Sequence, residues 1–172
     1  GGMLAMKKLV ALRSIAMFFL AVQSPLPAQT LRVGRSAVDI TPPAGMPFQV
    51  PQRPPFPVVI ATGTHDPLQA KAIVFEHGGV KAAIVACDLT SLPVHLIAAA
   101  RQEVARRCTV PPENVMITAT HTHTVPNIRP RFFPTATPAQ MKVATDYLDR
   151  LPEMIAESVQ RAERDLTAAR LQ

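Results

Sequence analysis

Two apolar, β-prone runs separated by one helix-length segment constrain the fold of this chain more than any other feature. The first run covers residues 80–88, and the second covers residues 114–123. Between them, Ser91 can cap a helix that has Pro93 in its first turn. Apolar residues then recur at helical spacing: Leu96, Ile97, Ala100, Val104 and Ala105. A strand, a helix and a strand of this length form a right-handed parallel crossover, and the nearly continuous apolar character of residues 80–88 indicates a central strand.

A β-hairpin is predicted immediately before this crossover. Residues 68–76 alternate as a strand does, and Gly78 and Gly79 follow, where glycine tolerates the positive φ of a tight turn. Residues 31–40 supply an earlier strand. The predicted fold class is therefore α/β: a mixed β-sheet with a β-hairpin, a parallel βαβ crossover and flanking helices.

A long helix is predicted from Pro138 to about Ala169. Its apolar residues recur at helical spacing: Met141, Ala144, Leu148, Leu151, Ile155, Val159 and Leu166. Pro152 lies inside this pattern and is expected to kink or divide the helix. We expect the helix to pack on the sheet.

Two proline-containing loops are predicted. Residues 41–57 contain seven prolines, so they cannot form a central strand and are expected as an extended loop over the domain. Met46 and Phe48 give this loop apolar anchors, so it is either a wall of a site or a disordered linker. Residues 125–137 form the second loop, in which Arg129 and Arg131 either meet an anionic or carbonyl group or are simply solvated.

The N-terminal residues 1–28 have the pattern of an export signal. Lys7 and Lys8 precede an apolar run, residues 9–22, which is short for a transmembrane helix and typical of a signal peptide. Ala28 is the favoured last residue before cleavage; a retained membrane anchor is the alternative. We therefore expect a secreted or periplasmic protein whose mature domain is residues 29–172.

Composition excludes one class of partner. The formal net charge of the 172 residues is +6, but the leader contributes three basic residues and no acidic ones. The rest of the chain has 15 basic against 12 acidic side chains, no tryptophan and no block of Lys or Arg. This composition has no nucleic-acid-binding signature.

The chain has two cysteines, Cys87 and Cys108, so one disulfide is the most it can form. Cys87 is expected inside a strand, and Cys108 at the end of the helix that runs back along it. The two residues then differ by several positions along the strand, at about 3.3 Å each. This separation exceeds the ~7 Å between Cα atoms that a disulfide allows, so we predict two free thiols.

Three side chains are predicted to meet where the two parallel strands end. In a strand, residues i and i+2 share a face, so His121 and His123 are expected to project together and begin a metal site, with zinc the first choice. Asp88 ends the neighbouring strand at the edge where α/β sheets bind ligands. It can orient a histidine or bind the metal directly. The alternatives are hydrogen-bonded surface histidines and an Asp88 that caps the following turn through Thr90 or Ser91.

His65 and Asp66 lie in a turn and can reach the same edge of the sheet, or remain solvated.

Five short stretches of this sequence occur together in one known family. They are VGRSAVDITPP at residues 33–43, HDPL at 65–68, AIVACDL at 83–89, PPENV at 111–115 and ATHTH at 119–123. Across nearly all of residues 31–170 the chain resembles the N-terminal domain of the neutral/alkaline non-lysosomal ceramidase family.

This resemblance implies a zinc-dependent amidase that splits ceramide into a fatty acid and sphingosine. His121 matches the first zinc ligand of the family, and His123 matches the adjacent histidine that lines the site. The expected metal ligands are therefore His121 and His123, and the expected catalytic residues are His123 and Asp88. Zinc lowers the pKa of bound water toward ~7 and polarises an amide carbonyl. The expected partner is a lipid-like amide substrate, ceramide or another N-acyl lipid, with peripheral membrane contact as a further candidate.

The chain also departs from the family pattern. Thr124, Val125 and Pro126 stand where the family has Ser-Gly-Pro. Family members are several times longer, and their remaining ligands, a histidine, a glutamate and a tyrosine, lie beyond the position of residue 172. A catalytic zinc needs three protein ligands. We therefore expect residues 29–172 to be either the metal-binding, N-terminal part of a longer catalytic domain or a non-catalytic fragment that serves as an interaction module with an exposed sheet edge.

Overall fold

The frame of the molecule is a five-stranded sheet in the order β6-β5-β4-β1-β7. The computed structural model describes residues 30–49, 58–125, 128 and 136–170. The strands of this sheet are β1 (Arg32–Asp39), β4 (Gln69–His77), β5 (Val80–Cys87), β6 (Val115–Ala119) and β7 (Thr167–Ala168). The predicted signal peptide, residues 1–28, and Arg129 and Arg131 lie outside the described residues.

The predicted mixed sheet is confirmed. Strands β5 and β6 pair in parallel, whereas β4 pairs antiparallel with both β5 and β1. The hairpin between β4 and β5 turns at Gly78 and Gly79, whose φ angles are 62° and 77°. These positive angles are the reason that glycine occupies both positions.

The connection between β5 and β6 is the predicted helix, α2 (Val94–Arg107), followed by a short 3₁₀ turn, Pro112–Asn114. The predicted cap is wrong: the N-cap residue is Pro93, and no side chain caps this helix. The buried face contains Leu96, Ala100 and Val104, as predicted, but Ala105 is exposed.

The long helix α3 (Pro138–Arg164) begins with a capping box, in which the side chains of Thr137 and Gln140 each accept a hydrogen bond from the other's backbone N–H. Pro152 does not divide the helix, which continues past it to Arg164. The helix is shorter than predicted because the chain then leaves it to form β7, which pairs with β1.

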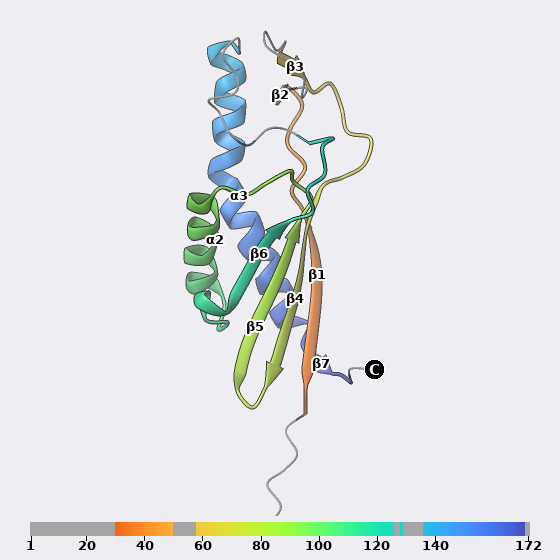
Figure 1. The fold of residues 1–172 in the computed structure, drawn as a ribbon, viewed down its shortest axis with the longest axis vertical. Coiled ribbons are helices and arrows are strands. Elements are labelled where there is room, and N and C mark those ends of the chain that lie inside the picture. The colour runs from red at the N-terminus through yellow and green to blue at the C-terminus, as the bar shows by residue number, and fades with distance from the viewer. Residues whose placement is uncertain (1–29, 50–57, 126–127, 129–135, 171–172) are drawn as a thin grey trace, which may run out of the picture.

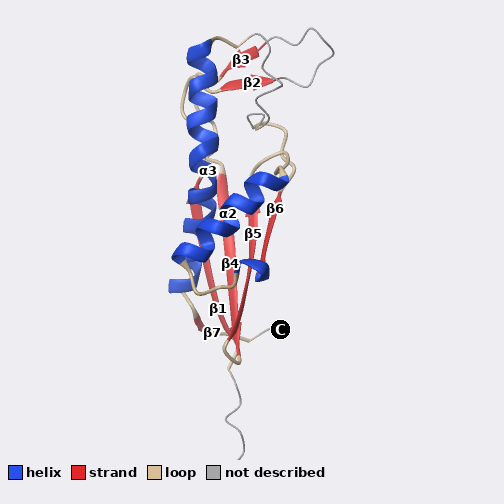
Figure 2. Ribbon diagram, turned by 90° about the vertical axis from the view of Figure 1, so that its left-hand side faces the viewer, coloured by secondary structure: helices blue, strands red, loops and turns tan. Residues whose placement is uncertain are grey.

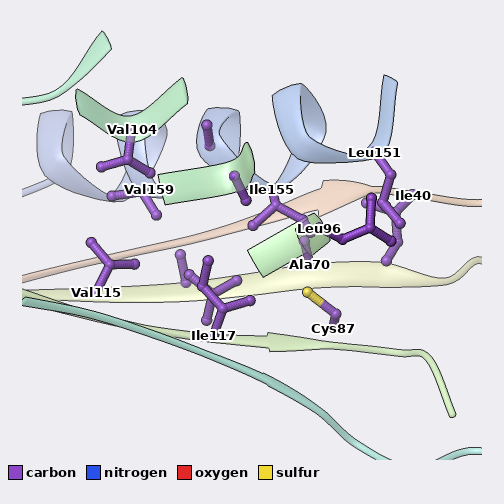
Figure 3. Close-up of a cluster of buried hydrophobic side chains, with 14 of the residues drawn as sticks. Ile40, Ala70, Cys87, Leu96, Val104, Val115, Ile117, Leu151, Ile155 and Val159 are labelled. Carbon is purple, nitrogen blue, oxygen red and sulfur yellow. The ribbon is translucent and has the colours of Figure 1, made fainter. Parts of the chain in front are cut away.

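Both helices lie on one face of the sheet (Figures 1 and 2). Side chains on that face of the strands, including Val74, Val85 and Ile117, are buried against α2 and α3 and form the core (Figure 3). The neighbouring side chains point the other way: Ile73 is 42% exposed, Ile84 41% and Met116 53%. Strand β5 is therefore interior to the sheet, as predicted, but within the described part of the chain only one of its faces is covered.

Helix α3 crosses strand β1 at unusually short range. A Cβ atom on Gly34 would lie 1.9 Å from the carbonyl oxygen of Ala162, so only glycine fits there. Next to this crossing, the Ser36 hydroxyl donates to the carbonyl of Ser158 at 2.6 Å. Farther toward the N-terminus of α3, the Tyr147 hydroxyl donates to the carbonyl of Ile40 at 2.7 Å. These contacts hold the helix along the length of β1.

Part of the proline-rich segment forms a strand, which differs from the predicted loop. Strand β2 (Pro47–Gln49) pairs antiparallel with β3 (Val58–Ile60) in a separate two-stranded sheet. Proline is tolerated because Pro47 is the first residue of β2, where it interrupts no central ladder. Met46 is fully buried and anchors this small sheet to the core.

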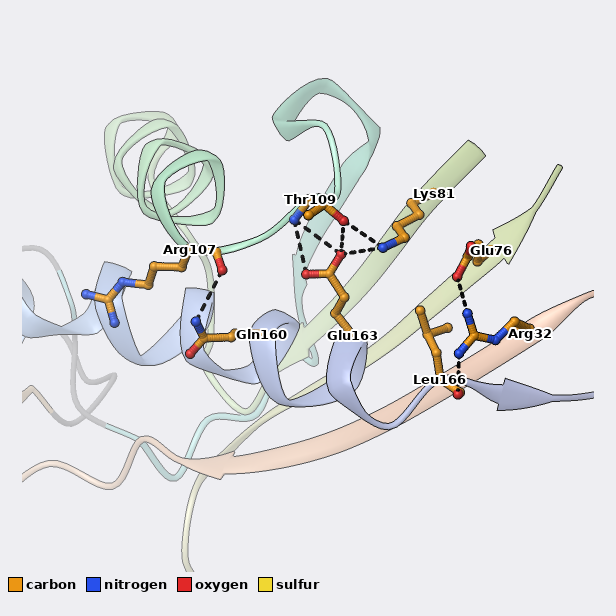
Figure 4. Close-up of polar contacts among 8 residues, drawn as sticks. All are labelled: Arg32, Glu76, Lys81, Arg107, Thr109, Gln160, Glu163 and Leu166. Carbon is orange, nitrogen blue, oxygen red and sulfur yellow. Dashed lines mark hydrogen bonds and ion pairs between the residues drawn. The ribbon is translucent and has the colours of Figure 1, made fainter. Parts of the chain in front are cut away.

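The end of the sheet at the β4–β5 turn is tied together by polar contacts (Figure 4). Glu163 of α3 accepts hydrogen bonds from Lys81 Nζ at 2.9 Å and from the backbone N–H of Thr109. Arg32 bridges Glu76 and the carbonyl of Leu166.

Cys87 and Cys108 are both free, as predicted. Among the described residues, no helix is long and apolar enough to cross a bilayer.

Candidate functional site

The candidate site lies where β5 and β6 end side by side. Strand β6 ends at Ala119, two residues before His121. His121 has a φ of 64°, in the left-handed region that few residues other than glycine adopt. The alternation of side chains along a strand therefore does not explain how the two histidines meet. They meet nonetheless: the ring centroids of His121 and His123 are 5.0 Å apart, in an edge-to-face arrangement.

Four hydrogen bonds connect residues 120–123, called the histidine turn below, to residues 87–90 at the end of β5 and just after it. The backbone N–H of Thr120 donates to the carbonyl of Cys87 at 2.9 Å, and the backbone N–H of His121 donates to the carbonyl of Leu89 at 3.0 Å. The Thr90 hydroxyl donates to the carbonyl of Thr122 at 2.8 Å. Nδ1 of His121 lies 2.8 Å from the carbonyl oxygen of Thr90.

The last contact determines which nitrogen of His121 is available. A carbonyl oxygen only accepts hydrogen bonds, so Nδ1 of His121 must carry the proton in this geometry. In the neutral ring, Nε2 then keeps its lone pair and can bind a metal. Both His121 and His123 are exposed, so an ion can reach them from solvent.

Asp88 lies near the histidine turn but has other partners. One carboxylate oxygen accepts from the backbone N–H of Gln69 at 3.1 Å and from Lys71 Nζ at 3.2 Å. The other accepts from the Thr120 hydroxyl at 3.4 Å. Asp88 therefore links the ends of β4, β5 and β6 and positions the residue next to His121. The hydrogen-bond partner of the His121 ring at this edge is the carbonyl of Thr90.

A cavity of about 420 Å³ opens beside this edge of the sheet. Its wall includes Thr41, Pro42 and Phe48, so part of the proline-rich segment lines a cavity. The role of this segment as the wall of a functional site remains a prediction. His65 and Asp66, an exposed pair 2.9 Å apart, line the same cavity as Asp88. Thr122 and Thr124 also line it, which places the cavity next to the histidine turn.

The histidine pair fits the first part of a zinc site. Two imidazoles, one with a free Nε2 fixed by a hydrogen bond at Nδ1, are the donors that zinc prefers. A complete cage is a different matter: the part of the chain that the structure describes contains no group of three or more His, Cys, Asp or Glu side chains able to hold a metal ion. The assignment of His121 and His123 as ligands and of His123 and Asp88 as catalytic residues remains a prediction.

No sequence pattern indicates the role of Thr90. The sequence suggests it only as a capping partner of Asp88, whereas its two contacts are to His121 and Thr122. One of these contacts uses a backbone carbonyl, an atom that every residue has, so no residue pattern distinguishes it.

The fold is shared with solved ceramidases. A crystal structure of the neutral ceramidase from Pseudomonas aeruginosa matches with a TM-score of 0.64 and 22% sequence identity, covering 81% of this chain and 22% of that one. A structure of a ceramidase complexed with C2 matches with a TM-score of 0.63, 22% identity and the same coverage. No family model and no curated protein matches. The chain thus spans about a fifth of the length of the ceramidase chains whose fold it shares.

Proposed function

We propose that residues 29–172 form the metal-binding portion of a secreted zinc-dependent amidase that hydrolyses ceramide or a related N-acyl lipid. The observation that carries the proposal is the histidine turn: two imidazole rings 5.0 Å apart, at the end of parallel strands, in a fold shared with neutral ceramidase. A likeness of fold alone would not indicate a reaction, so the placement of these rings is essential to the argument.

The residues have distinct roles in this proposal. His121 binds zinc through Nε2, and the carbonyl of Thr90 holds its ring in position. His123 contributes from the same turn as a second ligand or as a proton-transfer group. Asp88 acts from the adjacent strand end through Thr120. When bound, the zinc ion would supply Lewis-acid activation of water and of the amide carbonyl.

The cavity is suited to a ligand with both apolar and polar parts. Pro42, Phe48 and Leu68 form apolar wall, and His65, Asp66 and Asp88 supply polar groups. In this proposal the apolar wall holds part of an acyl chain while the amide lies near the histidine turn. Peripheral contact with the membrane that contains such lipids belongs to the same proposal.

A second candidate function is an interaction module without catalysis. The observation that favours it is the uncovered face of the sheet, where Ile73, Ile84 and Met116 form one row across three strands and are all exposed. An exposed apolar row of this kind is typical of a surface that contacts another protein.

Zinc binding by the full chain tests the first proposal. Isothermal titration with zinc chloride is expected to detect binding that His121→Ala removes and His123→Ala weakens. His77→Ala is the matched control, because His77 is an exposed histidine at the opposite end of the sheet. Zinc binding that is equal in the His121→Ala and His77→Ala variants would reject the histidine turn as the metal site.

A further inference from the structure

The backbone of His121 is held in an unfavourable conformation. Among the described residues, it is the only non-glycine residue with a positive φ. For a residue with a Cβ atom, the left-handed conformation is sterically unfavourable. Surrounding contacts must offset this cost, and such conformations are concentrated at functional sites. The question is which residue holds His121 there.

Thr90 contacts both sides of the strained residue. Its carbonyl oxygen lies 2.8 Å from Nδ1 of the His121 ring, and its hydroxyl donates to the carbonyl of Thr122 at 2.8 Å. The neighbouring backbone bond, from His121 N–H to the carbonyl of Leu89, also reaches this segment. The backbone bond fixes the position of the turn, whereas the two Thr90 contacts fix the ring and the peptide that follows it.

We propose that Thr90 is a positioning residue for His121: its hydroxyl holds the left-handed turn at Thr122, and its carbonyl selects the ring form in which Nδ1 carries the proton. The proposal rests on the proposed function only in assigning a purpose to the free Nε2, which is metal binding. The hydroxyl makes a contact at Thr122 that the backbone bonds of Thr120 and His121 do not make. Its loss is therefore expected to release the peptide that follows His121, and with it the ring.

The Thr90→Val substitution separates the two contacts of this residue. Valine has the same shape and the same backbone carbonyl but lacks the hydroxyl, so the bond to Thr122 is lost while the acceptor for His121 remains. Thr90→Ser keeps the hydroxyl and should preserve the geometry. The matched control is Thr118→Val, because Thr118 is an exposed residue of β6 whose hydroxyl reaches only the adjacent carbonyl, at 3.5 Å.

The primary readout is the ring form of His121 in the metal-free full chain, measured by nitrogen-15 NMR, which distinguishes the two neutral forms of the ring from each other. In the wild type, Thr90→Ser and Thr118→Val, the Nδ1–H form is expected to predominate at His121. In Thr90→Val, the spectrum should shift toward the Nε2–H form that a histidine side chain prefers in water. Thermal unfolding of all four proteins separates this effect from a general loss of stability.

The second readout is zinc affinity. Removing a group that orients a metal-binding histidine lowers affinity by about 10–100-fold, so Thr90→Val is expected to bind zinc that much more weakly than Thr90→Ser. A wild-type His121 in the Nε2–H form, or an unchanged ring form in Thr90→Val, would overturn the proposal. If neither the wild type nor any variant binds zinc, but the ring form of His121 still depends on the Thr90 hydroxyl, the positioning role is supported. The proposed metal function is then rejected.

Discussion

Two individual residues have large expected effects on stability: Gly34, where α3 approaches β1, and Glu163, whose carboxyl accepts hydrogen bonds from Thr109 and Lys81. Gly34 permits the closest approach between helix and sheet, since a Cβ there would lie 1.9 Å from the Ala162 carbonyl. Gly34→Ala is expected to destabilise the protein by at least about 1–3 kcal/mol, because backbone atoms must move to relieve the clash. Urea denaturation measures this change.

Gly63→Ala is the control for Gly34→Ala. A Cβ on Gly63 would meet no atom within 4 Å, and the residue has no positive φ. It should be neutral or slightly stabilising, because alanine restricts the unfolded chain. Equal midpoints for the two variants would show that α3 does not lie against β1 as described.

Glu163 makes stability depend on pH. Burial by itself raises the pKa of this carboxyl, but hydrogen bonds from Thr109 and Lys81 outweigh it and hold the pKa below its ordinary value. Because the folded-state pKa is the lower one, the stabilisation is complete above the unfolded-state pKa of about 4.3 and is lost as pH falls through the folded-state value. Wild type should therefore lose more stability below about pH 4.5 than Glu163→Gln.

The measurement for Glu163 is the free energy of unfolding as a function of pH. Glu157→Gln is the matched control, because Glu157 forms an exposed pair with Arg161 one helical turn away. Such a pair contributes little to stability, so this variant should follow the wild-type curve. Parallel curves for wild type and Glu163→Gln would contradict the assignment.

At the scale of the element, the sheet has one covered and one open face. Val85 and Ile84 are neighbours on β5, yet Val85 is fully buried and Ile84 is 41% exposed. Val85→Thr places a hydroxyl in the core and should cost about 1–3 kcal/mol. Ile84→Thr keeps a β-branched side chain on the open face and should cost no more than about 0.5 kcal/mol.

Thermal or urea unfolding of these two variants tests the layer order directly. Both variants introduce threonine, at adjacent positions of the same strand, so the strand propensity of the new residue is the same in each. A large loss of stability from Ile84→Thr would mean that the open face is covered in solution, by a second copy of the chain or by another segment.

At the scale of the whole molecule, we predict that the number of metal ligands limits activity. The histidine turn supplies two imidazoles, whereas a catalytic zinc site has three protein ligands. We expect residues 29–172 to bind zinc weakly and to hydrolyse no ceramide at a useful rate. Positioning contributes much of catalysis, and a misplacement of about 1 Å can cost about a hundredfold.

A chimera provides the contrast. Joining this chain to the remaining region of a ceramidase whose fold it shares should restore zinc loading and amide hydrolysis, and His121→Ala in the chimera should abolish both. Asp88→Asn should lower turnover by about 10–100-fold if Asp88 orients the site. Elemental analysis of zinc together with an amide-release assay measures these outcomes; stoichiometric zinc and clear amidase activity in residues 29–172 alone would contradict the prediction.

The sequence determined the features that depend on local physics. Gly78 and Gly79 specify the hairpin turn, because few other residues adopt positive φ twice in succession. Apolar spacing specified α2, α3 and the strands β4, β5 and β6, to within about five residues at their ends. The proximity of His121 and His123 was predicted from the alternation of side chains along a strand, but the two rings meet through a turn after β6 instead.

Only the tertiary structure decided the features that join distant backbone atoms. The covered face of the sheet depends on where α3 lies, and no pattern within β5 specifies that. Strand β7, which follows α3, forms by pairing Thr167 and Ala168 with the start of β1 at the edge of the sheet. The ring of His121 is hydrogen-bonded to Thr90, which is 31 residues away in sequence. This contact accompanies the left-handed backbone conformation of His121. A backbone carbonyl has no signature in the residue sequence, so the geometry that leaves Nε2 of His121 free appears only in the folded chain.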